Sequence, residues 1–189
     1  MKTINDILAI FPRTKAEEWK QHDKGKGWVQ ITAYVEATAT IMGVVYGNAQ
    51  VSDNAQVYDN AQVYGNAQVS GNAQVSGYAR MSGNAQVFGN AQVYGDAQVS
   101  GYARMSGNAW VFGDAWVSGD AWETSPLYIQ GSRHSVTNCA HGSIAIGCQV
   151  HTFAEWKAKY KTIGKAEGYT AAQIKEYSHH IAYVIKVGK

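Results

Sequence analysis

A repeat of six residues runs through the middle of the sequence without a break. From residue 47 to residue 124, the chain divides into thirteen hexads of the form Gly-Asn-Ala-Gln-Val-X, where X is usually Ser, Tyr or Phe. A hexad does not match the period of about 3.6 residues of an α-helix, so successive valines would point in conflicting directions on a helix. The repeat therefore excludes a helical middle and predicts short extended units.

Each hexad is predicted to form one short strand and one turn. Ala and Val lie two positions apart and face one side of a strand, whereas Gln and the last residue face the other side. Gly-Asn takes the corner, because both residues tolerate a positive φ angle. We expect Ala and Val to point into a core, and Gln to point outward.

This pattern resembles the hexapeptide-repeat family of left-handed parallel β-helices. The family places a small residue four positions after an aliphatic one, as in Val51 and Ala55. Three hexads close one triangular coil in that family. The resemblance therefore implies a mainly β protein, with a little more than four coils in the thirteen hexads and degenerate coils extending back to Val29.

Three domains are expected: a helical cap at residues 1–28, the left-handed β-helix at 29–124 and a small α+β domain at 125–189. The cap is needed because the end of a solenoid exposes unpaired backbone groups. We expect one short helix in the cap through apolar residues Ile4, Ile7, Leu8 and Phe11. A second helix is expected over residues 14–21, around Trp19.

The resemblance also implies a homotrimer, because three prisms pack around an axis in the family. Tyr58, Tyr94 and Phe112 share one face of the coils and would either form this contact or remain solvated. Three tryptophans replace Gln in the last three hexads, one on each face of the final coil: Trp110, Trp116 and Trp122. They would either grip a ligand or a partner as a collar, or pack against the C-terminal segment or a neighbouring subunit.

Catalysis by the coils is disfavoured, although the resembling family includes acyltransferases that act on coenzyme A substrates. Those enzymes use a His on the coils as the general base. Here no His occurs between His22 and His134, and no Lys occurs between Lys26 and Lys157. Without a base, a hydroxyl or amine nucleophile is not activated at neutral pH. A carbonic anhydrase on this fold would need His ligands in the coils, so no metal or other cofactor is implied.

Charge divides the chain. The formal net charge is +2, which favours neither a nucleic-acid polymer nor a membrane as partner. The charge is unevenly distributed along the chain. Residues 47–124 hold 2 basic and 6 acidic side chains, net −4, whereas residues 125–189 hold 8 basic and 3 acidic side chains, net +5. No apolar run is long enough to span a membrane. With only two cysteines and a poor secretory signal at the start, we expect a cytoplasmic protein without disulfides.

The C-terminal segment predicts a hairpin followed by two helices. Residues 131–151 alternate in polarity around Gly142, as a β-hairpin does. The pairs Thr152 with Glu155 and Thr170 with Gln173 have capping-box spacing and should open the two helices. We expect the inward faces to be formed by Phe153, Trp156, Tyr160 and Ile163 in the first helix, and by Ile174, Tyr177, Ile181 and Val184 in the second.

This segment resembles a small domain of phage and prophage proteins that is often joined to hexapeptide repeats. The matching places are Gly131-Ser132-Arg133, Thr137, Gly147-Cys148 and Thr152. The resemblance implies a phage-encoded accessory protein and supplies no established activity.

Three kinds of chemistry compete for this segment. Five potential metal ligands lie close together in the sequence, namely His134, Cys139, His141, Cys148 and His151, but they lack a zinc-knuckle spacing. Cys148 with a His base could act as a nucleophile. Alternatively, the segment forms an anion pocket. In it, the Arg133 guanidinium makes a bidentate contact with a phosphate, Ser132 and Thr137 donate hydroxyl hydrogen bonds, and His134 or His141 adds a further donor. The competing interpretation is structural, with these side chains satisfying backbone groups.

We therefore expect a non-enzymatic, homotrimeric, phage-type protein that binds an anionic small molecule through its basic C-terminal domain. By analogy with phage proteins that sequester nucleotide signals of bacterial immunity, the ligand would be nucleotide-like. A structural or protein-interaction module without a small ligand is the alternative.

Overall fold

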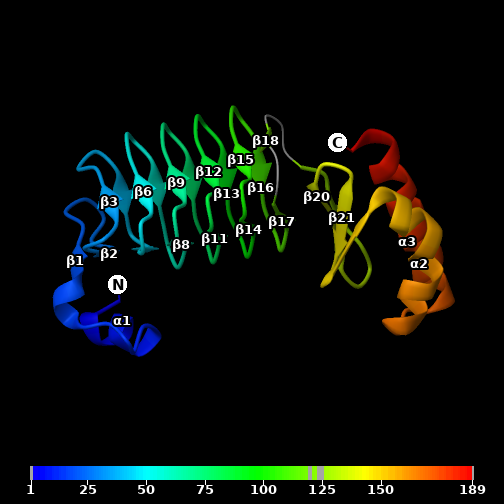
Figure 1. Ribbon diagram of the computed structural model, residues 1–189, viewed down its shortest axis with the longest axis horizontal. Helices are drawn as coiled ribbons and strands as arrows, with labels where there is room; N and C mark the ends of the chain where they lie inside the picture. The colour runs from blue at the N-terminus through cyan, green and yellow to red at the C-terminus, as the bar shows by residue number, and fades with distance from the viewer. Residues whose placement is uncertain (1, 119–120, 123–125, 189) are drawn as a thin grey trace.

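The computed structural model describes residues 2–118, 121–122 and 126–188. Figure 1 shows an elongated molecule in which the chain runs from helix α1 through a stack of coils to a small sheet and two helices. Within the described residues, no helix combines the length and the apolar character that crossing a membrane demands.

The coils form a parallel β-solenoid of about five turns with three sheets. One sheet contains β2 (Trp28–Gln30), β5 (Val44–Val45), β8 (Gln62–Val63), β11 (Arg80–Met81), β14 (Gln98–Val99) and β17 (Trp116–Val117). The second contains β3 (Tyr34–Val35), β6 (Gln50–Val51), β9 (Gln68–Val69), β12 (Gln86–Val87), β15 (Arg104–Met105) and β18 (Ala121–Trp122). The third contains β4 (Thr40–Ile41), β7 (Gln56–Val57), β10 (Gln74–Val75), β13 (Gln92–Val93) and β16 (Trp110–Val111).

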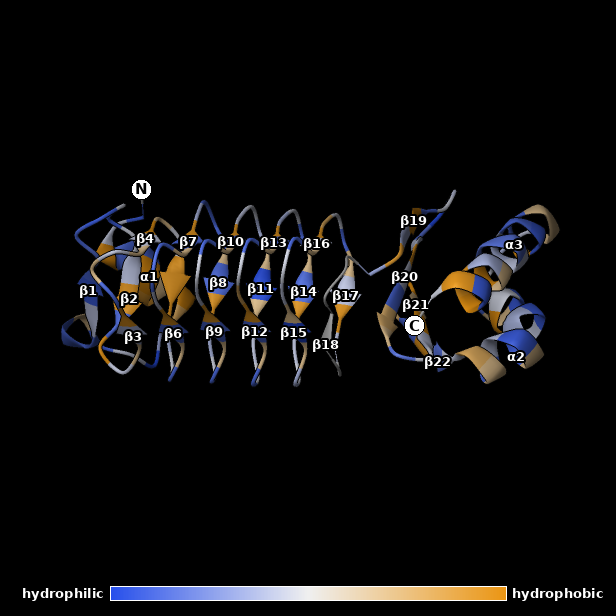
Figure 2. Ribbon diagram, turned by 90° about the horizontal axis from the view of Figure 1, so that it is seen from above, coloured by the Kyte–Doolittle hydropathy of each residue, from blue (hydrophilic) through white to orange (hydrophobic). Residues whose placement is uncertain are grey.

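Strand register confirms the predicted coil of three hexads. Gln74 pairs with Gln92, and Val75 pairs with Val93, each three hexads further along the chain. The predicted inward positions are also confirmed, because the Ala and Val side chains of the hexads form one continuous buried column. In Figure 2 the strands of successive coils lie side by side as the register requires. Each coil thus buries the same residues against the next.

The corners depend on the left-handed backbone that glycine allows. Gly95 has a φ of +76°, and a Cβ there would lie 3.0 Å from the backbone N and O of Gly113 in the next coil. Asp53 and Asp59 replace glycine at two corners and keep positive φ angles of 58° and 55°. The Asp53 carboxylate accepts a hydrogen bond from the Gly71 N–H at 2.9 Å, which helps to hold this less favourable conformation.

The N-terminal cap contains one of the two expected helices. Helix α1 (Ile4–Ile10) is confirmed, and Thr3 with Asp6 forms its capping box. The second expected helix is wrong: a 3₁₀ turn at Ala16–Glu18 leads directly into strand β1 (Trp19–Gln21). Strand β1 pairs antiparallel with β2 and so covers the open edge of that sheet, an arrangement that local helix propensity does not encode.

The last coil departs from the expected ladder. With three full hexads per coil, Trp122 would pair with Arg104 at an outward position. Instead, Ala121 pairs with Arg104, and Trp122 pairs with the inward residue Met105. The spacing between the paired residues of β15 and β18 is therefore one residue shorter than three hexads. The Trp122 side chain lies outside the described structure.

The C-terminal domain is an antiparallel four-stranded sheet covered by two helices. Its elements are β19 (Tyr128–Gln130), β20 (Ser135–Ala140), β21 (Ser143–Ile146), β22 (Gln149–Thr152), α2 (Phe153–Ala166) and α3 (Ala171–Val187). The expected β20–β21 hairpin and both capping boxes are confirmed. Val136 and Ile144 of the sheet share a buried cluster with Trp156, Ile181 and Val184 of the helices.

The sheet of this domain docks directly onto the last coils. Strand β20 packs beside β17, and the Ser118 N–H donates a hydrogen bond to the Cys139 carbonyl at 2.7 Å. The Tyr128 ring packs on Phe112 with a centroid separation of 4.9 Å, and its hydroxyl donates to Asp114 at 2.8 Å. The sheet thus lies between the solenoid and the two helices, as Figure 2 shows.

Candidate functional site

The loop between β19 and β20 is fixed by one hydroxyl from helix α3. The Tyr177 hydroxyl accepts hydrogen bonds from the N–H groups of His134 at 2.6 Å and Arg133 at 3.1 Å, and it donates to the His134 carbonyl at 2.6 Å. A Cβ at Gly131 would collide with this hydroxyl, so glycine is required there. Tyr177 therefore sets the position from which Arg133 extends.

Arg133 lies exposed at the surface of the domain. Its guanidinium is stacked over the Tyr169 ring at 4.8 Å, and Nη1 donates a hydrogen bond to the Gly168 carbonyl at 2.9 Å. A guanidinium carries five N–H donors in a fixed plane. With respect to the described part of the chain, most of these donors remain available to a ligand.

His134 and Ser132 have partners within the domain. His134 Nδ1 lies 2.6 Å from the Tyr169 hydroxyl. Burial, followed by the neighbouring Tyr177, raises the pKa of Tyr169 to about 12, so this phenol stays protonated. Ser132 donates both its N–H and its hydroxyl to the Glu176 carboxylate. These hydrogen bonds hold the pKa of Glu176 below its ordinary value.

The structure does not bring Thr137 or His141 to this loop. Thr137 is only 2 % exposed in the middle of β20, where it pairs with Tyr128 and Ala145. His141 lies in the turn at the opposite end of that strand. A strand of this length spans about 20 Å, which separates His141 from Arg133. Of the five residues expected to form an anion pocket, Ser132, Arg133 and His134 are therefore grouped together, and two are not.

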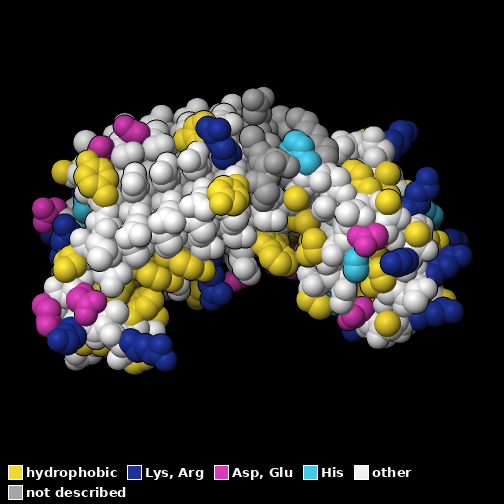
Figure 3. Space-filling model, viewed as in Figure 1, with side chains coloured by type: hydrophobic (Ala, Val, Ile, Leu, Met, Phe, Trp, Pro, Cys, Tyr) yellow, Lys and Arg dark blue, Asp and Glu magenta, His cyan; other side chains and the backbone are white. Residues whose placement is uncertain are grey.

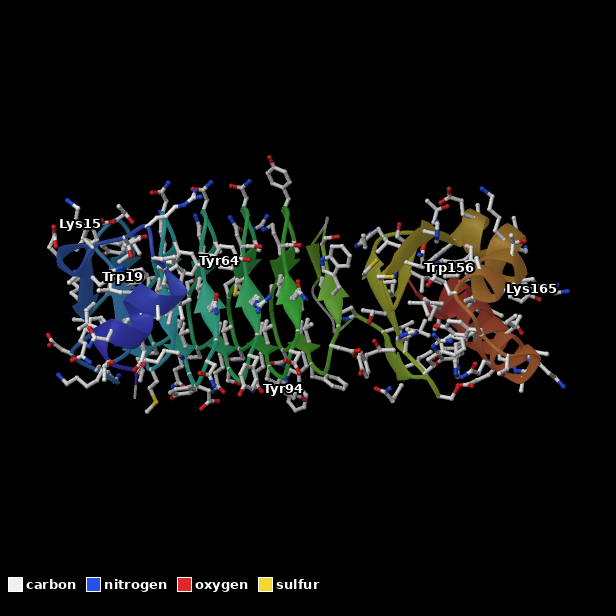
Figure 4. The ribbon with its side chains drawn as sticks, turned by 90° about the horizontal axis from the view of Figure 1, so that it is seen from below. Lys15, Trp19, Tyr64, Tyr94, Trp156 and Lys165 are labelled. Carbon is white, nitrogen blue, oxygen red and sulfur yellow. The ribbon has the colours of Figure 1, made fainter. Side chains whose placement is uncertain are left out.

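A small cavity adjoins this loop, between the sheet and the helices. Its volume is about 40 Å³. Its apolar wall consists of Ile146, Trp156, Tyr160, Ile163, Ile174 and Ile181. The rest of the lining comes from His134, Cys148, Gln149, Gly164, Glu167, Tyr169 and Tyr177. Figure 4 shows Trp156 between the strands and the helices of the domain. The sequence placed several of these residues in the core but did not indicate a space among them.

Two of the three expected tryptophans lie on separate faces of the last coils, as predicted. Trp110 of β16 and Trp116 of β17 are 47 % and 42 % exposed, and they belong to two different sheets. Trp116 Nε1 donates to the Ser100 hydroxyl at 3.3 Å, and the Trp110 ring makes an edge contact with Tyr94. Trp122 pairs one residue out of the expected register and its side chain lies outside the described residues, so the collar of three tryptophans stays a prediction.

The cysteines and histidines are dispersed. Cys139 is buried and Cys148 is exposed. Burial raises the pKa of the Cys139 thiol, which disfavours the reactive thiolate. His151 packs edge-on against Trp156 and lies 3.2 Å from the Gln149 side-chain oxygen. Among the residues that the structure describes, no three His, Cys, Asp or Glu side chains come together as a metal site.

Positive charge gathers on the same domain. Figure 3 shows Lys and Arg side chains over the C-terminal helices, whereas the visible face of the solenoid is mostly uncharged. Residues 125–189 hold 8 basic and 3 acidic side chains. The loop of Arg133 is therefore part of a domain whose overall potential favours anions.

Comparison with known proteins identifies the repeat. The family model of the YdcK beta-solenoid repeat matches residues 49–65, 61–77, 67–83, 85–101 and 91–107. No curated protein and no solved structure matches the chain. The five matches all lie in the solenoid, so they concern its fold and carry no activity. In its repeat, the chain is therefore similar to the YdcK beta-solenoid repeat.

Proposed function

We propose that this protein is a non-enzymatic binding protein whose C-terminal domain holds an anionic small molecule at Arg133. The observation that carries the proposal is the exposed guanidinium, which lies over the Tyr169 ring and donates one hydrogen bond to the Gly168 carbonyl. A planar fork held in one orientation loses little side-chain entropy when it binds a phosphate or carboxylate in a bidentate manner. The solenoid serves as the rigid carrier.

The surroundings of Arg133 support an anion more than a cation. The nearby Glu176 carboxylate already accepts two hydrogen bonds from Ser132 and lies 3.4 Å from His180 Nε2. The domain is net positive by its 8 basic and 3 acidic side chains. By analogy with phage proteins that sequester nucleotide immune signals in the host cytoplasm, cyclic nucleotides and ADP-ribose derivatives form the first panel of ligands.

The test is native mass spectrometry of protein purified from cells, followed by calorimetric titration with the ligand found. Arg133→Ala should weaken binding by about 1.5–3 kcal/mol, the usual range for a hydrogen bond to a charged group. Arg133→Lys should restore little, because an ammonium lacks the planar fork. Arg80→Ala, on a solenoid strand, is the matched control and should bind like the wild type.

These comparisons require equal thermal stability, because a loosened loop would also reduce apparent affinity. If Arg133→Ala binds as tightly as the wild type, the ligand binds elsewhere. If no panel ligand raises the melting temperature and none is carried through purification, the proposal fails.

We also propose that the solenoid is left-handed and assembles as a homotrimer through its flat faces. The hexad pattern and the register of three hexads per coil support this, together with an aromatic stripe in which Tyr94 stacks on Phe112 at 5.6 Å. Tyr58 lies on the same face, and Ser76 stands between Tyr58 and Tyr94 in the ladder of residues 18 apart. Light scattering at micromolar concentration should give three times the chain mass of 20.5 kDa, and a monomer mass would contradict the trimer.

A protein-interaction module is the second candidate. It is favoured by large side chains left exposed on the solenoid, with Tyr102 at 73 % and Tyr78 at 64 %. A Trp116→Ala and Tyr102→Ala double variant that loses a partner from cell extracts, while the small-molecule panel stays without effect, would favour this function over ligand binding.

A further inference from the structure

The cavity of the C-terminal domain lies next to Arg133. His134 and Tyr169 both line the cavity, and the Arg133 guanidinium covers the Tyr169 ring. A ligand placed at this point would therefore meet a cationic guanidinium and an apolar space, both of which adjoin the Tyr169 ring. The ligand would combine an anionic group with an apolar one.

The walls of the cavity determine the kind of apolar group. The indole N–H of Trp156 donates to the Ile144 carbonyl at 2.8 Å, so it needs no hydrogen-bond acceptor from a ligand in the cavity. The remaining deep wall is formed by Ile146, Ile163, Ile174 and Ile181, which offer no hydrogen bond. Apolar cavities of this kind exclude water and accept apolar groups.

The volume sets the size of that group. An apolar cavity of about 150 Å³ holds a benzene ring, whereas this cavity has a volume of about 40 Å³. An aromatic ring or a nucleobase is therefore too large without rearrangement. The same comparison allows about 25 Å³ for each of the six carbons of benzene, so a short alkyl group of about two carbons is the matching group.

The polar rim fixes the direction in which such a ligand enters. Glu167 also lines the cavity, and the Gln149 side-chain amide donates to its carboxylate at 2.8 Å. The Arg133 guanidinium over Tyr169 attracts an anionic headgroup, so the headgroup belongs on the Tyr169 side of the cavity. The alkyl chain then passes His134 and Tyr169 into the isoleucine wall.

We propose that this site binds a short-chain alkyl or acyl anion, with its phosphate or carboxylate on Arg133 and its chain in the cavity. The position of the headgroup rests on the function proposed above. The chain-length preference rests only on the cavity.

The test is a titration series with methyl, ethyl, propyl, butyl and hexyl phosphate, followed by heteronuclear NMR shifts of the Trp156 indole. Burial of one methylene strengthens binding about fourfold. Affinity should rise by about that factor for each carbon up to ethyl, and then level off when the cavity is full. An affinity that does not depend on chain length would overturn the proposal.

Two variants of the wall sharpen the test. Ile174→Val removes one methyl group and should move the plateau to a chain one carbon longer. Gly164→Ala should shorten the preferred chain, because a Cβ at Gly164 would lie 2.9 Å from Ile174 Cγ1 and force that side chain to move. Ile185→Val is the control, since Ile185 packs on the same core but does not line the cavity. An unchanged plateau in both wall variants would contradict the assignment.

Butylammonium separates the two proposals. If butyl phosphate binds with a chain-length plateau and Arg133→Ala weakens it, both proposals are supported. If butylammonium binds more tightly than butyl phosphate, and a series of alkylammonium ions reaches its plateau at the same chain length, the anion site is contradicted and the cavity assignment is supported. If inorganic phosphate binds as well as butyl phosphate, the anion site survives and the cavity assignment fails.

Discussion

In the solenoid the same contact is made in every coil, whereas each contact of the C-terminal domain is made once. Val69 lies between Val51 and Val87 in one ladder, and equivalent ladders fill the other faces. In the C-terminal domain a single tyrosine, Tyr177, holds a loop that lies 43 and 44 residues away in the chain.

The two regions therefore divide two tasks. A repeated contact gives a stiff carrier whose structure follows from local pattern and nearest-neighbour stacking. In the C-terminal domain the contacts differ from one another, and this allows a cavity, a fixed arginine and a buried hydroxyl to occur together at one place. The candidate site lies where the structure is least repetitive.

The largest effect is expected inside the solenoid. Val69→Asp places a carboxylate in a fully buried apolar column and should cost more than about 5 kcal/mol, enough to prevent folding. The measurement is the yield of soluble protein with a cooperative melting transition. Gln68→Glu, at the exposed neighbouring position, should change stability by less than about 0.5 kcal/mol. A stable Val69→Asp protein would show that the inward and outward positions are reversed.

A large but local effect is expected for Trp156→Ala. It removes a buried indole and its hydrogen bond to Ile144, which should cost about 3–5 kcal/mol. If the two regions unfold separately in spite of their docking, the C-terminal domain should melt first and the solenoid should remain. Hydrogen exchange resolved by peptide would report this order. One shared transition for both regions would instead show that their docking couples them.

A smaller effect is expected for Tyr177→Phe, which leaves the backbone groups of Arg133 and His134 without their shared partner. The expected loss is about 1–3 kcal/mol, measured by urea unfolding. Tyr183→Phe on the exposed side of the same helix is the control and should be neutral. Equal losses in both variants would mean that the hydroxyl of Tyr177 does not fix the loop.

The smallest effect concerns the junction between the regions. Burial alone would raise the pKa of Asp114, but hydrogen bonds from Ser135 and Tyr128 outweigh it and lower the pKa below its ordinary value of 3.8. Its stabilising contribution is therefore complete above that ordinary value and is lost as the pH falls through the lower folded value. We expect less than about 1 kcal/mol from this exposed residue, because solvent screens its charge.

Unfolding of wild type and Asp114→Asn across the acidic range up to neutral pH measures this contribution. The stability difference between the two proteins should shrink as the pH falls below 3.8. The variant isolates Asp114 from the other carboxylates that titrate in this range. A stability difference that stays constant with pH would show that the Asp114 carboxylate does not stabilise the junction.

Much of the fold could be predicted because the informative residues recur. The buried Ala and Val and both C-terminal capping boxes follow from spacing alone, and the coil of three hexads follows from the resemblance to hexapeptide-repeat β-helices. Strand β1 could not be predicted in this way. Residues 14–21 have apolar residues that suit a helix, but the unpaired edge of β2 offers backbone hydrogen bonds that outweigh this preference.

Less of the candidate site could be predicted. The exposed position of Arg133 and its neighbour His134 agree with the sequence motif, but Thr137 and His141 are separated from them by the run of β20. The occurrence of a Tyr on the buried face of α3 was the one signal that could have been used, because a buried phenol requires a partner for its hydroxyl.

The sequence by itself determined which side chains of the solenoid face inward, since Ala and Val recur at the same two places in most of the thirteen hexads. Only the tertiary structure decided the capping strand β1, the shortened spacing at Trp122, the hydroxyl of Tyr177 beneath Arg133 and the cavity beside Tyr169. The physical reason is the range of the contacts. A repeat encodes its neighbours at a fixed spacing, whereas a cavity and a fixed loop depend on side chains that meet only after distant elements have packed.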